Sequence, residues 1–244
     1  MKKIAIILIY ISLFICTLRG QKIFYVNHPI ISNSNYNYHN LQELHNKLIQ
    51  EYGSTVNEDI TIEVYDDWYP ESTLLWKING TPDHKVTVIG DKNGQGSRPI
   101  FYGSSIDTVS QPYGAPALII NAEYVTISNI HFKSFYGATH YKPGHKKYNK
   151  CQHRVALTIN GNYNSIKECK FSDFTGIGPE AAISIPIDRK YNRVAQCDFA
   201  NLNGHIFLHA VYINGGDSNL VINNYVEDCS GGPFKVKNMA INNK

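Results

Sequence analysis

The chain has 244 residues, enough for one elongated domain with a continuous core. Its 23 lysines and arginines against 20 aspartates and glutamates leave a formal charge of +3, which by itself implies no partner. Nucleophile elbows, phosphate-binding glycine loops and nucleic-acid-binding modules are absent from the sequence, so we expect no nucleic-acid partner.

Residues 1–20 have the pattern of a secretory signal peptide. Two lysines follow Met1, an apolar run extends from Ile4 to Leu18, and Gly20 provides a small residue for cleavage. A membrane anchor is the alternative, but the run of about 15 apolar residues is shorter than the ~20 that span a bilayer. We therefore predict a secreted protein, extracellular or periplasmic, with one domain over residues 21–244 and no membrane contact after cleavage.

The first predicted elements are a strand at 23–26, a polar loop at 33–40 and a helix at about 40–52. Leu41, Leu44 and Leu48 repeat with helical spacing. Asn40 is the predicted N-cap, and Gly53 ends the helix. We expect this amphipathic helix to cap one end of a β array. Strands are predicted next at residues 60–65, 86–89, 99–102 and 117–120.

A six-residue signature with two apolar positions then occurs four times. The first position is occupied by Phe132, Phe171, Phe199 and Val226. The second is occupied by Phe135, Phe174, Leu202 and Cys229. An upstream apolar column consists of Ile127, Ile166, Val194 and Val221. This repetition predicts an all-β, single-stranded right-handed parallel β-helix of about six rungs, in which equivalent side chains stack inward.

Four cysteines follow the predicted cleavage site: Cys151, Cys169, Cys197 and Cys229. Export would permit disulfide bonds. However, Cys169 and Cys197 hold the same inward position in successive repeats, in register with Ile130 and Asn224. Because a buried cysteine packs as a small hydrophobic residue, we predict a stack of thiols at this position.

The chain resembles the pectate-lyase-like superfamily of secreted β-helix proteins. The matching parts are the first strand at 23–26, the capping helix, the segment 59–69 and the repeats that end at Asn223, Asn224, Tyr225 and Val226. The resemblance covers nearly all of residues 22–244. It implies a right-handed parallel β-helix but no single activity, because this scaffold carries lyases, hydrolases, epimerases and adhesins.

The insertion at about 138–154 contains five lysines and arginines and no acidic residue. Such a positive segment suits an anionic polymer, and we predict that Lys146, Lys147 and Arg154 contact its carboxylate or sulfate groups. The alternative is a solvated loop whose charges repel one another. Its three histidines match no zinc pattern, so no metal site is predicted.

The strands that follow the loops read 155–159, 181–185, 209–213 and 233–237. Alternation places Phe234 and Val236 inward with their counterparts in earlier strands. The outward ladders are then Ala156, Ala182, Ala210 and Pro233; Thr158, Ser184, Tyr212 and Lys235; and Asn160, Pro186, Asn214 and Lys237. We predict a shallow groove in which Tyr212, Asn214 and Lys235 contact a sugar chain. An ordinary solvated sheet face is the alternative.

The repeats are also distantly similar to those of chondroitin- and alginate-degrading β-helix lyases. In that family a catalytic lysine lies on the strand after an Asn-aromatic turn, and Lys237 matches this position after Asn224 and Tyr225. The partner arginine of the family comes from the next rung, of which this chain holds only the beginning. The residues themselves imply no cofactor; the resemblance raises calcium as a candidate, without a matching acidic cluster.

Together these patterns predict a protein that binds an acidic polysaccharide and cleaves it by lyase-type β-elimination. The alternative is a non-catalytic glycan-binding or adhesion module. We also expect the C-terminal end of the stack to be uncapped or truncated, so that a partner or a missing segment would cover it.

Overall fold

The computed structural model describes residues 21–29, 36–70, 72–103, 116–136, 155–175, 181–203 and 208–237. The predictions for the signal peptide at 1–20, the basic insertion at 138–154 and the end of the chain at 238–244 lie outside these residues.

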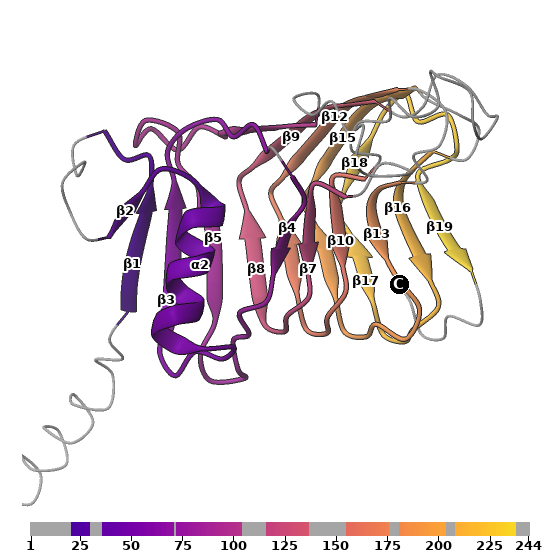
Figure 1. The fold of residues 1–244 in the computed structure, drawn as a ribbon. Coiled ribbons are helices and arrows are strands. Elements are labelled where there is room, and N and C mark those ends of the chain that lie inside the picture. The colour runs from indigo at the N-terminus through magenta and orange to yellow at the C-terminus, as the bar shows by residue number, and fades with distance from the viewer. Residues whose placement is uncertain are drawn as a thin grey trace, which may run out of the picture.

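Parallel strands in three sheets make up the fold (Figure 1). Sheet 1 contains β1 (Gln21–Val26), β2 (Asn37–Tyr38), β3 (Asp59–Val64), β5 (Val86–Gly90), β8 (Val125–Ser128), β11 (Ser165–Lys167), β14 (Arg193–Ala195) and β17 (Leu220–Ile222). Sheet 2 contains β4 (Leu74–Trp76), β7 (Leu118–Ile120), β10 (Leu157–Ile159), β13 (Ala181–Ile185), β16 (His209–Asn214) and β19 (Phe234–Lys237). Sheet 3 contains β6 (Ile100–Tyr102), β9 (His131–Tyr136), β12 (Lys170–Thr175), β15 (Asp198–Asn203) and β18 (Tyr225–Val226).

From β7 onward the chain visits sheet 2, sheet 1 and sheet 3 in turn, and each strand pairs with the strand three places later. β10 pairs with β7 and β13, β11 with β8 and β14, and β12 with β9 and β15, all in parallel. We call one such set of three strands a rung. This order is compatible with the predicted parallel β-helix. Strand β4 was not predicted from the sequence, and β2 lies in a segment predicted to be loop.

Helix α2 (Leu41–Tyr52) confirms the predicted helix and lies beside β3 and β5 at the N-terminal end of the stack (Figure 1). The Asn40 side chain accepts a hydrogen bond from the Glu43 amide (2.8 Å), which caps the first turn. Leu44 and Leu48 are fully buried in the same apolar core as Phe24. The helix therefore covers the inner side of the first strands.

Strand β1 is tied to this helix by Lys22. Its ammonium group forms an ion pair with Glu51 and donates a hydrogen bond to the Tyr52 hydroxyl (2.8 Å). These hydrogen bonds raise the pKa of Lys22. Tyr52 in turn donates to Glu58 (2.5 Å), and burial together with that bond raises the pKa of Tyr52 to about 12.

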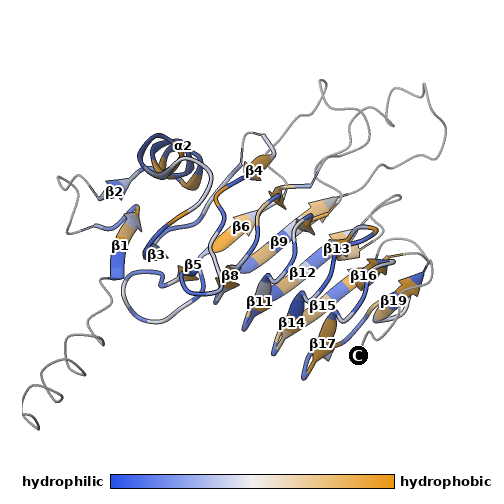
Figure 2. Cartoon of the chain, turned by 90° about the horizontal axis from the view of Figure 1, so that it is seen from below, coloured by the Kyte–Doolittle hydropathy of each residue, from blue (hydrophilic) through white to orange (hydrophobic). Residues whose placement is uncertain are grey.

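The predicted apolar columns are confirmed by the strand register. Phe171 pairs with Phe132 and with Phe199, and the neighbouring ring centroids are 4.9 Å apart. Phe135 and Phe174 stack at 4.7 Å in a second column. All five rings are fully buried, and their spacing is about the 4.8 Å distance between paired strands. In Figure 2 apolar and polar segments alternate along the strands, as this packing requires.

Sheets 1 and 3 are joined by a bend with left-handed backbone. The same position in four rungs has φ between 53° and 56°, and it is occupied by Asn129, Glu168, Gln196 and Asn223. Asparagine tolerates this conformation best, whereas glutamate and glutamine adopt it at a cost. The pairing of the flanking strands therefore fixes the bend in every rung.

A ladder of buried asparagines supports the turn between sheets 2 and 1. The Asn192 side chain accepts a hydrogen bond from the Asn164 amide (3.0 Å) and donates one to the Gly161 carbonyl (3.0 Å). Asn219 makes the equivalent bonds to the Asn192 amide (3.0 Å) and the Arg189 carbonyl (2.8 Å). The ladder satisfies backbone groups that the turn removes from water. It was not predicted from the sequence.

The cysteine stack is confirmed for Cys169 and Cys197, which are free thiols and fully buried. The two cysteines are kept in register by the backbone, since the Asp198 amide, next to Cys197, donates a hydrogen bond to the Cys169 carbonyl (2.9 Å). Burial raises the pKa of Cys169, so its thiol packs as an inert apolar group. Cys229, also a free thiol, is half-buried, and Cys151 lies outside the described residues.

Phe234 and Val236 occupy the predicted inward columns, in register with Val211 and Ile213. The expectation that they are buried is wrong: their exposed fractions are 45% and 51%, against 1% and 3% for their partners. β19 lies at the edge of sheet 2 in the described part of the chain, so one side of these residues lacks a neighbouring strand.

Candidate functional site

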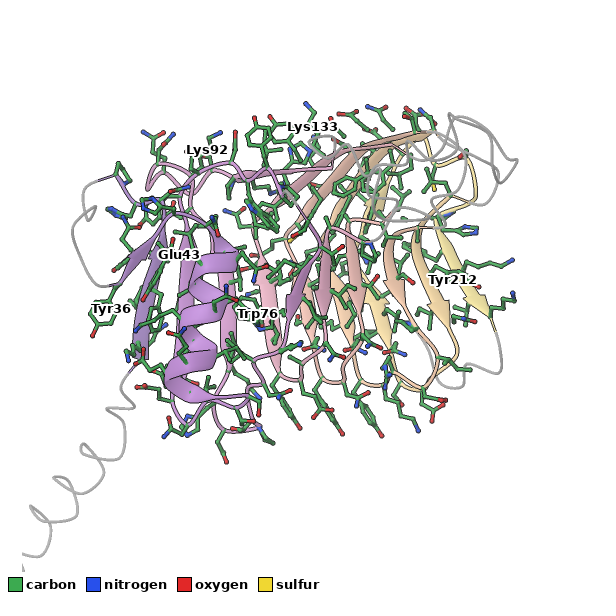
Figure 3. All side chains as sticks on the ribbon, in the orientation of Figure 1. Tyr36, Glu43, Trp76, Lys92, Lys133 and Tyr212 are labelled. Carbon is green, nitrogen blue, oxygen red and sulfur yellow. The ribbon has the colours of Figure 1, made fainter. Side chains whose placement is uncertain are left out.

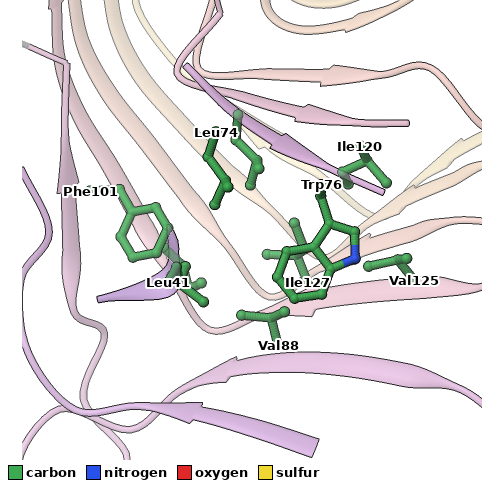
Figure 4. Close-up of a pocket in the computed structure, with 10 residues that line it drawn as sticks. Leu41, Leu74, Trp76, Val88, Phe101, Ile120, Val125 and Ile127 are labelled. Carbon is green, nitrogen blue, oxygen red and sulfur yellow. The ribbon is translucent and has the colours of Figure 1, made fainter. Parts of the chain in front are cut away.

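The cavity shown in Figure 4, inside the stack, is too small to hold a ligand. That cavity lies between Leu41 of α2, Trp76 of β4 and the core residues Val88, Phe101 and Ile127, and its volume is about 10 Å³. A space of this size holds one water molecule at most, and its apolar lining gives that water no partner. The candidate functional residues lie instead on the outer faces of the sheets.

The outer face of sheet 2 brings four of the predicted site residues together. Tyr212 pairs with Lys235, and Asn214 pairs with Lys237, on the adjacent strands β16 and β19. Tyr212 and Asn214 are half-buried, whereas both lysines are exposed. The alternation of β16 buries Val211 and Ile213, so the four polar side chains share the opposite face.

The Tyr212 ring has a neighbour on its own strand. The His209 and Tyr212 rings are nearly parallel, with an interplanar angle of 13° and centroids 6.2 Å apart. His209 is 7% exposed, and its Nδ1 lies 3.0 Å from the Gly232 carbonyl oxygen, which anchors the imidazole. Tyr212 therefore has a fixed aromatic neighbour and is itself only half-buried, which leaves part of its side chain exposed for stacking on a sugar.

One of the three predicted outward ladders is wrong, although its last member, Pro233, is exposed. Ala156, Ala182 and Ala210 were assigned to the outer face by alternation, but all three are fully buried in the apolar core. The other two predicted ladders are accessible. In one, Thr158, Ser184 and Tyr212 are half-buried and Lys235 is exposed. In the other, Asn160, Pro186 and Asn214 are half-buried and Lys237 is exposed. The predicted contacts Lys146, Lys147 and Arg154 lie outside the described residues.

The outer face of sheet 3 carries a second polar group that the sequence analysis missed. Lys170 pairs with His131, and Ser172 pairs with Lys133, on the adjacent strands β9 and β12. Because Phe132 and Phe171 point inward between them, these four side chains occupy the corners of a square on the outer face. We call these four residues the His131 square. Figure 3 places Lys133 on a different face from Tyr212.

One diagonal of the His131 square is a hydrogen bond, since His131 Nε2 lies 2.9 Å from Ser172 Oγ. Ser172 Oγ also donates to Asp173 Oδ2 (3.2 Å), and this carboxylate lies 3.8 Å from Lys133 Nζ. Burial lowers the pKa of His131 to about 4, with further lowering by the nearby ammonium groups of Lys170 and Lys133. The imidazole is therefore neutral at pH 7.

The His131 square had a detectable signal in the sequence. Its residues flank the first phenylalanine of two signature copies, at the positions immediately before and after Phe132 and Phe171. Reading these outward positions as columns would have aligned His131 with Lys170 and Lys133 with Ser172. Their different residue types hid the alignment.

The described residues hold no group of three or more His, Cys, Asp or Glu side chains that could bind a metal ion. The described ranges therefore offer no such cluster to the calcium that the family resemblance suggests. Within those ranges, no helix is both long and apolar enough to cross a membrane.

Comparisons with known proteins return nothing for this chain: no family model, curated protein or solved structure matches it. Function is therefore inferred from the chain's own residues.

Proposed function

We propose that this protein is a secreted right-handed parallel β-helix, of the pectate-lyase-like kind, that binds an acidic polysaccharide along the outer face of β16 and β19. The observation that carries the proposal is the register of these two strands, which sets Tyr212 beside Lys235 and Asn214 beside Lys237. A polysaccharide could cross this face with a sugar on Tyr212 and its carboxylates on the two lysines.

The chemistry of the four residues suits such a ligand. Tyr212 offers an aromatic face, and the Asn214 amide can both donate and accept hydrogen bonds with sugar hydroxyls. Lys235 and Lys237 lie two residues apart on one strand, so their side chains project on the same side. Two exposed ammonium groups at that spacing favour a chain with repeated negative charge over a neutral one.

Lys237 is also the residue we assign as the base if the bound polymer is cleaved. In β-elimination the neutral amine form of Lys237 would remove the proton at C5 of the uronate, a C4–C5 double bond would form, and the C4–oxygen bond would break as that oxygen takes a proton from solvent water. The register of β16 and β19 supports binding more directly than cleavage. A non-catalytic glycan-binding module is the competing outcome.

Isothermal titration with defined oligosaccharides of alginate, pectate and chondroitin tests the binding proposal. We expect at least one of them to bind, and the Lys235→Met/Lys237→Met variant to bind it about tenfold or more weakly, the loss that ~1.4 kcal/mol produces. Lys47→Met, which alters an exposed lysine of α2, is the matched control. Equal affinity in the double variant and the wild type would refute the proposed site.

The same oligosaccharides distinguish a lyase from a binding module. A lyase releases unsaturated uronate ends that absorb ultraviolet light, and Lys237→Ala should abolish their appearance. Binding without any increase in absorbance would establish the non-catalytic alternative. Cleavage that persists in Lys237→Ala would show that another residue is the base.

A further inference from the structure

We propose that the His131 square on sheet 3 binds an oxyanion group, sulfate or phosphate, at a site separate from the polysaccharide face of sheet 2. Two ammonium groups, an imidazole and a hydroxyl converge there from two adjacent strands. An oxyanion needs positive charge and several hydrogen-bond donors within a small area, and the ammonium groups of Lys133 and Lys170 supply both.

The floor of the site is fixed in place. Ser172 is 4% exposed, and its contact with His131 Nε2 (2.9 Å) holds the imidazole across the square. Lys133 and Lys170 occupy the two remaining corners, on either side of this hydrogen bond. An anion resting on the imidazole would therefore lie between the two lysines, while the Ser172 hydroxyl, which donates to Asp173, orients the imidazole.

The charge around the square favours an anion. Arg98, Lys133 and Lys170 act on His131 from three segments, and each lowers its pKa, whereas Asp173 acts in the opposite direction. The carboxylate of Asp198 is already paired with Arg98 (3.3 Å). The three cations thus outnumber the two carboxylates, and their field, which adds to the larger effect of burial on the pKa of His131, attracts a negative ligand.

Asp173 is the internal competitor of the ligand. Its carboxylate lies 3.8 Å from Lys133 Nζ and accepts the Ser172 hydroxyl, so it occupies part of the positive field. Its backbone has a φ of 62°, in the left-handed region that asparagine tolerates. Asp173→Asn therefore removes the negative charge without a backbone penalty, and it should strengthen binding of the anion.

The His131 imidazole is a built-in reporter for the test. Its pKa is followed by NMR in sodium chloride and in sodium sulfate at equal ionic strength, so that screening is the same in both. We expect sulfate to raise the pKa of His131 by about one unit, which corresponds to a tenfold preference for the protonated site. In Asp173→Asn the sulfate concentration needed for half the effect should fall.

Lys133→Met and Lys170→Met, singly and together, should reduce or abolish the sulfate effect, and the singles keep the test valid if the double variant fails to fold. Lys235→Met is the control, because it weakens the proposed polysaccharide face without touching the square. An equal response to chloride and sulfate, or a full response in the double variant, would overturn the proposal. Tighter binding of a sulfated or phosphorylated sugar than of the inorganic ion would assign the site to a glycan, and equal binding to the free ion.

Discussion

Asn192 lies inside the turn between sheets 2 and 1, where it replaces the water that the backbone would otherwise bind. Its side chain accepts a hydrogen bond from the backbone amide of Asn164 and donates one to the backbone carbonyl of Gly161. Asn164 and Asn219 repeat the arrangement one rung away on either side. Each asparagine side chain therefore links its own turn to the backbone of the turn in the preceding rung.

Asn192→Ala should lower the free energy of unfolding by about 3 kcal/mol, because it leaves a buried amide and a buried carbonyl without partners. Asn160→Ala provides the comparison. Its side chain bonds to Asn121 (2.9 Å) and Arg189 (3.0 Å) nearer the surface, so its loss should cost less than about 1 kcal/mol. Urea unfolding followed by circular dichroism measures both values, and similar losses would contradict the role given to the ladder.

His131 makes stability depend on pH. Its pKa is about 4 in the folded protein, below the ordinary histidine value of 6.5, so the unfolded chain binds the proton more readily. Stability should therefore fall as the pH drops from about 6.5 to about 4, by at most about 3 kcal/mol. His131→Gln should flatten this part of the pH profile of unfolding, and the exposed His39→Gln should not. An unchanged profile in His131→Gln would contradict the assignment.

At the scale of elements, β7, β10, β13 and β16 of sheet 2 each pair with a strand on both sides, whereas β19 pairs on one side in the described part of the chain. Ile183 of β13 is paired on both sides, with Leu157 and Val211, and is fully buried. Val236 of β19 is paired with Ile213 and is half exposed. The contribution of an apolar residue to stability should therefore depend more on whether its rung has a neighbour on both sides than on which apolar residue it is.

Ile183→Ala should cost about 4 kcal/mol of unfolding free energy, since it opens a cavity between two strands. Val236→Ala should cost less than about 1 kcal/mol, because about half of that side chain is already in water. Denaturant titrations of the two variants test the difference. A similar loss in both would mean that Val236 is covered in solution, contrary to its exposure here.

The repeated features of these elements could be predicted from the sequence. Phe132, Phe171 and Phe199 share residue type and phase, so the repeat alone predicts their column. Alternation also placed Tyr212, Asn214, Lys235 and Lys237 on one face, because it depends on local backbone geometry alone. Helix α2 was found from its leucine spacing and its Asn40 cap.

What depends on neighbours from other parts of the chain could not be predicted in this way. Alternation assigned Ala156, Ala182 and Ala210 to the outside, but strict alternation fails at this position of the rung, where each alanine and the residue after it are both buried. The three-residue strand β4 is too short for a periodic pattern, and its position comes from pairing with β7. The asparagine ladder recurs at Asn164, Asn192 and Asn219, with the same two intervals as Phe171, Phe199 and Val226. Asparagine in a turn, however, is also expected from composition alone.

At the scale of the whole molecule, the regular stacking of rungs places residues from the same position of successive repeats on one surface. Sheet 2 presents Tyr212, Asn214 and the two lysines, and sheet 3 presents the His131 square, on different sides of the same rigid core (Figure 3). A ligand group on one face need not meet the other. The scaffold thus separates a proposed site for a polymer from a proposed site for a single oxyanion.

The most direct measurement is an amide NMR titration with the acidic oligosaccharide that binds best, which maps the contact on the folded protein. The proposed function predicts the largest shift changes at Tyr212, Asn214, Lys235 and Lys237, with little change on β1 and β3 at the other end of the stack. Large changes confined to other strands, or none at saturating ligand, would contradict the claim that β16 and β19 form the binding face.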